Sequence, residues 1–329
     1  MSALSVLNPT LLDLARATDP NGKPAIIAEI LNLTNDVLTD MTWTEGNMTT
    51  GNRSAIRAGL PTATFRQLYQ FVQPDKGTIA QVTDNCGMLE AYAVVDKALA
   101  DMAPNRDMFR LQEDKAHIEA MNQKVATTIF YGNEGSEPAA FTGLSPRYNS
   151  LSAANAENII DGGGTGTDNT SIWLVVWSPE TVFGFVPKNS TAGIQVEDKG
   201  QVTLQSTSGY MEAYQSHYRW DVGLAVRDWR YAVRIANIDK SNLTKDASSG
   251  ADLADLMFQA IDLIPSLQAG RASWYMSRRT LTFLRRQVAN ITKNSTLSIE
   301  NVGGKRITSF QDIHIGRVDA LAGDEARVI

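Results

Sequence analysis

Apolar residues recur at three- and four-residue spacing through the middle of the chain, which is the period of one face of a helix. The series starts behind Asp84, a suitable N-cap, and runs to about Tyr131. Pro104 interrupts it, because proline lacks a backbone N–H and clashes with the preceding turn. We predict a helix of about 45 residues, about 65 Å long if unbroken, that kinks or restarts there. The apolar positions are Met88, Leu89, Tyr92, Val95, Leu99, Met102, Met108, Leu111, Ile118, Met121, Val125 and Ile129.

Strand patterns dominate the following part of the chain, to about residue 240. Residues 172–177 form a continuous apolar run, which is typical of a strand buried on both faces. Residues 218–238 alternate between apolar and polar, which predicts a sheet with one solvent-exposed face. The mixture of long helix and strands indicates the α+β class.

The last third of the chain returns to helices. Residues 251–269 have a helical pattern with Pro265 near its end, and a second helix is expected from Arg278 to about Val288. A short strand at 272–276 separates them, and short strands follow around Ile307 and at 313–318.

The first 82 residues have too few aliphatic side chains to form a core of their own. Residues 1–38 hold only short apolar clusters, so we interpret them as an arm lying across the molecule or a neighbouring subunit. An ordinary docked N-terminal helix pair fits the pattern equally well. Residues 40–82 are rich in Thr, Gly, Asn and Gln with repeated turn signals, which predicts a protruding hairpin that packs on a partner.

Composition narrows the class of protein. A chain of 329 residues with 43% hydrophobic and 20% charged residues is globular, with about two lobes at ~150 residues each. The net charge of −6 gives no overall attraction for nucleic acid or anionic membranes. Cys86 is the single cysteine, so a disulfide within the chain is excluded and a buried apolar role in a reducing cytoplasm is expected. Neither a signal peptide nor a membrane span is indicated, so we expect a soluble protein.

Residue constellations that could carry catalysis, a cofactor or a metal are weak, and we predict none of these. The glycines at 162–166 precede a strand instead of a helix, so a surface loop is a better interpretation than a phosphate site. The Gly303-Gly304-Lys305-Arg306 stretch lacks Walker spacing and is expected to be a turn. His117, His217 and His314 lie outside any metal-binding spacing.

Basic residues are concentrated in two places. Between residues 263 and 299 there are six and no acidic ones, which we interpret first as partners for carboxylates within or between subunits and second as a DNA contact. The basic patch consists of Arg271, Arg278, Arg279, Arg285, Arg286 and Lys293. In the hairpin segment we expect contacts with a neighbouring subunit from Arg53, Arg57, Arg66, Phe65, Tyr69 and Phe71.

The order of these elements resembles the major capsid proteins of tailed bacteriophages with the Hong Kong 97-like fold, particularly those of short-tailed phages. Three stretches carry the likeness. Phe141-Thr142-Gly143-Leu144 is similar to the turn that often follows the family's spine helix, and 220–228 (WDVGLAVRD) and 274–284 (WYMSRRTLTFL) resemble capsid segments. The likeness spans nearly the whole chain.

The resemblance implies an α+β Hong Kong 97-like capsid fold with four parts. These are an N-terminal arm (1–38), an extended β-hairpin loop (39–82), a peripheral domain with the spine helix (83–170), and a mixed sheet that completes the peripheral domain and forms the axial domain (171–329). Its function would be self-assembly of an icosahedral head from hexamers and pentamers. Some family members crosslink through Lys and Asn, but Lys76 in the hairpin does not establish that chemistry.

The resemblance also implies partners and a place of action. Family members with a built-in scaffold begin with about a hundred extra residues, so a separate scaffolding protein is expected here. A portal protein is a further partner, and a cement or decoration protein stays open. Packaged DNA would be touched only non-specifically, and no membrane is involved. Assembly is expected in the host bacterial cytoplasm, and the mature location is the virion.

Two other interpretations stay open at this point. One is a different phage assembly protein, such as a tail-tube or decoration subunit. The other, less favoured, is a small-molecule or carbohydrate-active enzyme of mixed α+β architecture. A cleft with convergent carboxylates would favour the enzyme, and rings or tubes would favour the tail protein.

Overall fold

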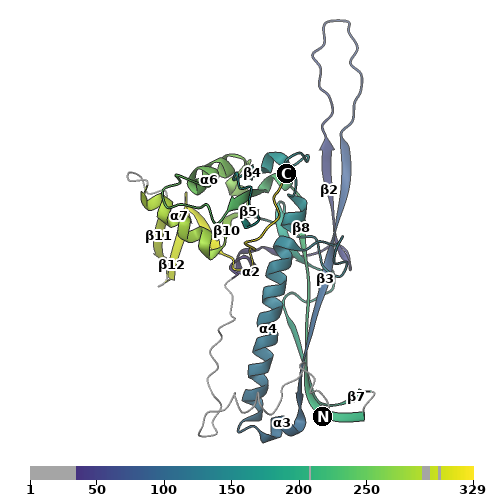
Figure 1. Ribbon diagram of the computed structural model, residues 1–329. Helices are drawn as coiled ribbons and strands as arrows, with labels where there is room; N and C mark the ends of the chain where they lie inside the picture. Colours follow the sequence, from purple (N-terminus) through teal and green to yellow (C-terminus); the bar gives the residue numbers. More distant parts are fainter. Residues whose placement is uncertain (1–34, 207–208, 291–296, 303–304) are drawn as a thin grey trace. The chain divides into compact units, whose positions relative to one another are not determined.

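The computed structural model describes residues 35–206, 209–290, 297–302 and 305–329 (Figure 1). The expected arm therefore lies almost wholly outside the described residues. The chain forms two compact units. The first contains Met88–Val125 and Thr191–Asp221, and the second contains Thr34–Gly87, Ala126–Ser190 and Val222–Ile329.

The second unit is built around a mixed sheet whose central strand is β5 (Asn169–Trp177), buried at every position. β5 pairs antiparallel with β9 (Ala232–Asp239) and β10 (Arg271–Met276), and parallel with β6 (Val182–Val186). The apolar run at 172–177 is thus confirmed as a strand buried on both faces. The other strands that lie wholly in this unit are β1 (Trp43–Glu45), β2 (Gly51–Gly59), β4 (Ile159–Asp161), β11 (Leu297–Val302), β12 (Lys305–Phe310) and β13 (Ile313–Arg317).

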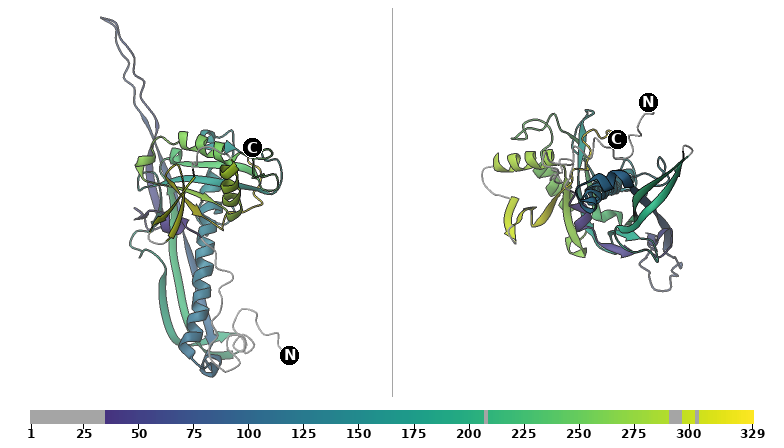
Figure 2. Two further views of the ribbon diagram at one scale, coloured as in Figure 1. Left: turned by 90° about the vertical axis from the view of Figure 1, so that its left-hand side faces the viewer. Right: turned by 90° about the horizontal axis from the view of Figure 1, so that it is seen from below.

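Two helices pack on this sheet and close its core (Figure 2). α6 (Leu253–Asp262) starts at Asp252, whose carboxylate accepts hydrogen bonds from the N–H groups of Ala254 and Asp255. α7 (Arg278–Asn290) follows β10 directly. The two predicted helices and the strand between them are confirmed, although α6 ends before Pro265, and a short 3-10 turn, η3 (Leu267–Ala269), follows that proline.

The first unit contains α3 (Lys97–Met102), most of α4 (Arg106–Tyr131), β7 (Gln195–Ser206), and parts of β3 (Thr78–Asp96) and β8 (Gly209–Val226). Its small core joins Val95 and Leu99 to Phe109. The guanidinium groups of Arg106 and Arg110 cover the ring of Tyr214 from 5.3 and 4.9 Å.

The helix predicted from residue 84 is wrong over its first part, because residues 78–96 form strand β3. Met88 and Tyr92, expected in the helix core, are 66% and 45% exposed. The alternating residues Leu89, Ala91, Ala93 and Val95 face inward instead, and β3 lies between β2 and β8 in the sheet. The apolar residues of this segment fit both the two-residue period of a strand and the three- to four-residue period of a helix. Pairing with the neighbouring strands β2 and β8 therefore determined that a strand forms. The interruption at Pro104 is confirmed, and the long helix is α4, with 26 residues.

The solvent-exposed face expected for residues 218–238 is also wrong. Strand β9 is buried at every position, although it carries Arg234, Asn237 and Asp239. The C-terminal segment supplies polar partners for the first two: Arg234 pairs with Glu325, and Asn237 bonds with Val328. A period-two pattern therefore marked a strand correctly but could not show that its polar side would be covered.

Candidate assembly surfaces

The hairpin consists of β2 (Gly51–Gly59) and the first part of β3, paired antiparallel from Gly51 opposite Asn85 to Gly59 opposite Thr78. The register shifts between Arg57 and Gly59. Beyond the paired strands, residues 60–77 form the long open loop drawn in Figure 1. The strand pairing confirms the predicted hairpin, and we call residues 60–77 the hairpin loop.

Large apolar side chains on the hairpin loop have almost nothing to pack against. Phe65 is fully exposed, and Tyr69 and Phe71 are 98% and 96% exposed. Exposed apolar clusters of this kind mark interaction surfaces. Leu60, Leu68 and Val72 in the hairpin loop are exposed as well, and so is Ile79 at the start of β3.

The three arginines of the hairpin segment are exposed as well. Arg53 donates from Nε to the hydroxyl of Thr83 at 3.3 Å. Within the described part of the chain, Arg53, Arg57 and Arg66 form no ion pair. All six hairpin residues selected from the sequence are therefore available to a partner, and they are spread along the hairpin instead of converging on one point.

Asp75 ties the two arms of the hairpin loop together. One carboxylate oxygen accepts hydrogen bonds from the backbone N–H and the hydroxyl of Thr62, at 2.8 and 2.6 Å. The other accepts from the N–H of Lys76 at 2.7 Å. The Thr62 hydroxyl and these N–H groups lower the pKa of Asp75, because they stabilise its ionised form. No sequence pattern indicates this role for Asp75, because its partner Thr62 lies on the opposite arm of the loop.

A buried ion pair holds the root of the hairpin. Asp84 on β3 lies 2.8 Å from the Arg147 guanidinium and is almost fully buried. Burial raises the pKa of Asp84, and the opposing effect of Arg147 does not fully cancel it. Arg147 also donates to the carbonyl oxygens of Thr142, Gly143 and Leu224. One side chain thus connects the hairpin root to the turn that follows α4 and to β8.

That turn, 141–144, is the first of the three stretches that carried the sequence resemblance. Phe141 and Leu144 are buried, and Gly143 donates its N–H to the carbonyl of Gly132 at 2.8 Å. A Cβ atom on Gly143 would lie 2.5 Å from the carbonyl oxygen of Thr128, closer than real Cβ contacts. Only glycine therefore lets this turn approach the end of α4.

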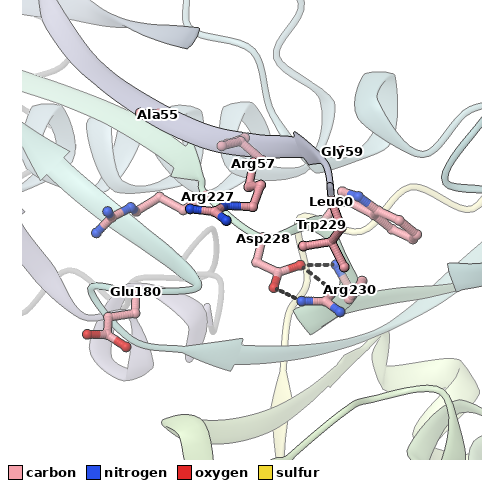
Figure 3. Close-up of a pocket in the computed structure, with 10 residues that line it drawn as sticks. Ala55, Arg57, Gly59, Leu60, Glu180, Arg227, Asp228, Trp229 and Arg230 are labelled. Atoms are coloured by element: carbon pink, nitrogen blue, oxygen red, sulfur yellow. Dashed lines mark hydrogen bonds and ion pairs between the residues drawn. The ribbon is translucent and has the colours of Figure 1, made fainter. Parts of the chain in front are cut away.

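A groove of about 710 Å³ lies at the hairpin base (Figure 3). Asp228 in this groove is tied to Arg230, whose guanidinium donates to both carboxylate oxygens at 3.0 and 2.7 Å. Burial alone would raise the pKa of Asp228, but Arg230 outweighs it and the pKa is lowered. Three arginines, Arg57, Arg227 and Arg230, thus share the groove with the carboxylates of Asp228 and Glu180. Its lining residues are Ala55, Ile56, Arg57, Gly59, Leu60, Glu180, Arg227, Asp228, Trp229 and Arg230.

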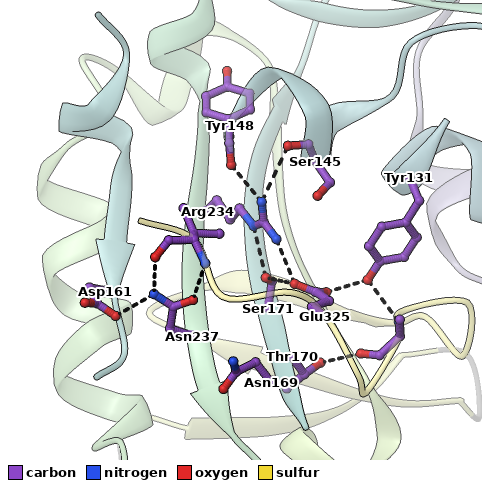
Figure 4. A network of polar contacts seen from close by, with 12 residues as sticks. Tyr131, Ser145, Tyr148, Asp161, Asn169, Thr170, Ser171, Arg234, Asn237 and Glu325 are labelled. Carbon is purple, nitrogen blue, oxygen red and sulfur yellow. Dashed lines mark hydrogen bonds and ion pairs between the residues drawn. The ribbon is translucent and has the colours of Figure 1, made fainter. Parts of the chain in front are cut away.

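A buried polar network fixes the C-terminal segment to the sheet (Figure 4). Arg234 lies 2.7 Å from Glu325, and both side chains are almost fully buried. Glu325 also accepts from the hydroxyls of Ser171 and Tyr131. Burial first, and then the Glu325 charge, raise the pKa of Tyr131 above its usual range. Every member has partners, as a buried charge pair requires.

Asn237 fastens the last residues in the same network. Its Oδ1 accepts from the Val328 N–H at 2.8 Å, and its Nδ2 donates to the Val328 carbonyl at 2.9 Å. Nδ2 also donates to Asp161 at 2.9 Å. The side-chain amide therefore stands in for a strand neighbour along the C-terminal backbone.

The basic patch of the sequence analysis divides into two groups. Arg271 pairs with Asp40 at 2.5 Å, and Arg278 pairs with Asp319 at 3.0 Å. The other three have no carboxylate partner among residues the structure describes. Arg279 donates to the Lys240 carbonyl, Arg285 donates to the Thr308 hydroxyl, and Arg286 lies over the Phe283 ring. Lys293 lies outside the described residues.

His217 and His314 have separate partners, each within its own unit. His217 stacks on Tyr92 with ring centroids 4.4 Å apart, and His314 lies 3.9 Å from Asp40. Among the described residues, no group of three or more His, Cys, Asp and Glu side chains could hold a metal ion. Cys86 is half-buried beside Phe183 and Phe185. This cysteine is therefore more exposed than the sequence predicted. No helix in the described ranges is long and apolar enough to cross a membrane.

Known proteins that are similar to this chain show which family it belongs to. The family model for the major capsid protein GP7 matches residues 19–329. The chain belongs to this family. The capsid protein structure of bacteriophage Epsilon15 is 39% identical, with a TM-score of 0.81, and the match covers 100% of this chain and 99% of that one. The Hong Kong 97-like fold expected from the sequence is confirmed.

More distant structures have only a general likeness to this major capsid protein. The bacteriophage JBD30 capsid is 9% identical with a TM-score of 0.46, covering 90% of this chain and 95% of that one. The SrpI encapsulin of Synechococcus elongatus PCC 7942 is 9% identical with a TM-score of 0.46, covering 70% and 96%. No curated protein sequence matches the chain.

Family membership answers the question of function class. The chain is a structural subunit of a phage head, located in the virion capsid, and it acts by assembling with copies of itself. The tail-tube, decoration and enzyme interpretations are therefore wrong.

Proposed function

We propose that copies of this chain form the hexamers and pentamers of an icosahedral shell, held together by the hairpin (39–82) and the arm (1–38), which lie over neighbouring copies. In this proposal 83–170 is the peripheral domain, and 171–329 completes it and forms the axial domain. The observation that carries the proposal is the exposure of Phe65, Tyr69 and Phe71 on the hairpin loop.

The energetic argument follows from burial. Covering one large apolar side chain stabilises by about 1.5–3 kcal/mol, so three would contribute roughly 5–9 kcal/mol per copy. Association itself costs about 4–15 kcal/mol. One hairpin contact alone is therefore marginal, and a closed arrangement that repeats it around every subunit is what makes the shell stable.

The arginines of the hairpin add direction to this contact. Arg53, Arg57 and Arg66 are exposed along it, and we assign them to carboxylates of the adjacent subunit. Charge pairs at the edge of an interface select orientation and speed up encounter more than they add affinity. They would set the register in which the aromatic side chains dock.

Membership of the capsid protein family suggests further partners, which we include in the proposal. A separate scaffolding protein guides assembly in the bacterial cytoplasm, a portal protein occupies one vertex, and a cement or decoration protein is a further candidate on the outside. The net charge of −6 supports only local, non-specific contact with packaged DNA.

Negative-stain microscopy of the protein expressed with and without its phage's scaffolding protein tests the proposal. The wild type should form closed shells of uniform size. The triple variant Phe65→Ser, Tyr69→Ser, Phe71→Ser should stay as folded, unassembled subunits. Val196→Ser, at another exposed apolar position, is the matched control and should assemble. Equal shell yields from the triple variant and the wild type would refute the hairpin's role.

A further inference from the structure

Helices α6 and α7 carry opposite charges on their outer faces. α6 has Asp255 and Asp262 and no basic residue, whereas α7 has four arginines and no acidic residue. Both helices bury their other faces in one core, where Leu253 and Met257 of α6 share a cluster with Leu284 of α7. Their charged faces are therefore fixed in direction by the packing below them.

The charges have matching spacing along the two helices. Asp255 and Asp262 are seven residues apart and exposed on one face of α6, with the partly exposed Phe258 between them. On α7, Arg279 and Arg286 are also seven residues apart and exposed. Seven residues bring a side chain back to nearly the same face about 10.5 Å further along the axis. Two such helices placed side by side would bring both carboxylates opposite guanidinium groups.

Within one copy these charges do not satisfy each other. No ion pair joins α6 to α7 among residues with a described position, and Asp255 accepts only from the Gln259 amide of its own helix. Arg279 donates to a backbone carbonyl, and Arg286 lies over a ring of its own helix. Arg278 is different, because Asp319 already neutralises it.

We propose that the basic face of α7 in one copy docks on the acidic face of α6 in the next copy around each ring of subunits. The two faces differ, so the contact is head-to-tail and repeats around a closed ring. Charge complementarity selects a second copy as the occupant, because this chain itself presents the acidic face with the required spacing. The inference rests on the proposed self-assembly and specifies one contact within it.

Charge reversal tests the contact. Arg279→Asp with Arg286→Asp, or Asp255→Arg with Asp262→Arg, should raise the subunit concentration needed for assembly by at least about tenfold, because like charges would then face each other. The quadruple variant combines both reversals, so every contact is complementary again, and assembly should return to near the wild-type level. Lys245→Glu, an exposed loop position off both helices, is the control.

The outcomes separate this inference from the proposed function. A wild type that never assembles, with or without scaffold, overturns the proposed function itself. Shells from both double variants at the wild-type concentration overturn only the helix contact, and so does a quadruple variant that stays unassembled. If the arginine variant assembles normally but its shells retain less DNA, the basic face meets nucleic acid and the proposal fails. Circular dichroism melts of the unassembled variants check that they fold.

Discussion

Arg147 and Asp84 form an ion pair at 2.8 Å that joins the turn after α4 to the root of the hairpin. Asp84 is the more deeply buried partner, and the Arg147 guanidinium also donates to three backbone carbonyls, those of Thr142, Gly143 and Leu224. A single guanidinium group thus connects the hairpin root to the turn after α4 and to β8. This pair links the root of the hairpin to the buried turn that contains Phe141 and Leu144.

Removing Arg147 should be costly. Arg147→Met leaves Asp84 buried without a counter-charge, which typically costs about 3–5 kcal/mol of unfolding free energy. Urea unfolding of the unassembled subunit measures the loss. Lys97→Met breaks the exposed pair with Asp101 and should cost less than about 1 kcal/mol. Equal costs for the two variants would show that Asp84 finds another partner.

Breaking the Arg234–Glu325 pair should lower the free energy of unfolding by a similar amount, and the loss should also be visible in hydrogen exchange. Glu325→Gln keeps the shape of the side chain but leaves the Arg234 charge uncompensated, and about 3–5 kcal/mol should be lost. Hydrogen exchange should accelerate in β9 and in the C-terminal segment. The exposed Arg230→Gln variant, which breaks the pair with Asp228, serves as control. Unchanged exchange in β9 would contradict the role given to the network.

Gly143 should not tolerate a side chain. A Cβ atom there would meet the Thr128 carbonyl oxygen at 2.5 Å, so Gly143→Ala must displace the end of α4. Overpacking of this kind costs about 1–3 kcal/mol. Gly135→Ala, in the same loop with more room, should change the melting temperature much less. A Gly143→Ala variant as stable as the wild type would disprove the close approach.

The raised pKa of Tyr218 should make the folded protein less stable at alkaline pH. Burial first, and then the Asp114 carboxylate, raise the pKa of Tyr218 to about 12 from its ordinary 10.0. The folded state therefore keeps the phenol proton where the unfolded state loses it. The stabilisation is complete below pH 10 and is lost as the pH rises toward 12, at roughly 1 kcal/mol per pH unit.

Urea titrations between pH 9 and about 11.5 measure this slope. Tyr218→Phe should flatten it, whereas Tyr210→Phe, at an exposed position, should leave it unchanged. Identical slopes for Tyr218→Phe and the wild type would mean that the phenol titrates normally in the fold.

The sequence was sufficient for elements whose buried surface forms a continuous apolar pattern. Strand β5 follows from an unbroken apolar run, and helices α6 and α7 follow from apolar periodicity, because each of them packs in the core. The prediction of a helix in place of β3 was wrong because Leu89 and Val95 fit a strand and a helix equally well. Only the neighbouring strands in the sheet determine which of the two forms.

The buried polar contacts between distant residues could not be predicted from the sequence. Arg234 and Glu325 are 91 residues apart, and no spacing rule connects them. The hairpin residues were easier to select, since Phe65 and Tyr69 stand in a segment with too few aliphatic neighbours to bury them. A shortage of local packing is visible in a sequence, whereas the identity of a distant polar partner is not.

A cryo-electron microscopy reconstruction of the assembled shell tests the central claim most directly. The account predicts that Phe65, Tyr69 and Phe71 of each copy lie buried against a neighbouring copy, with the hairpin loop ordered along that contact. A shell in which these three side chains face solvent, or fold back onto their own subunit, would contradict it.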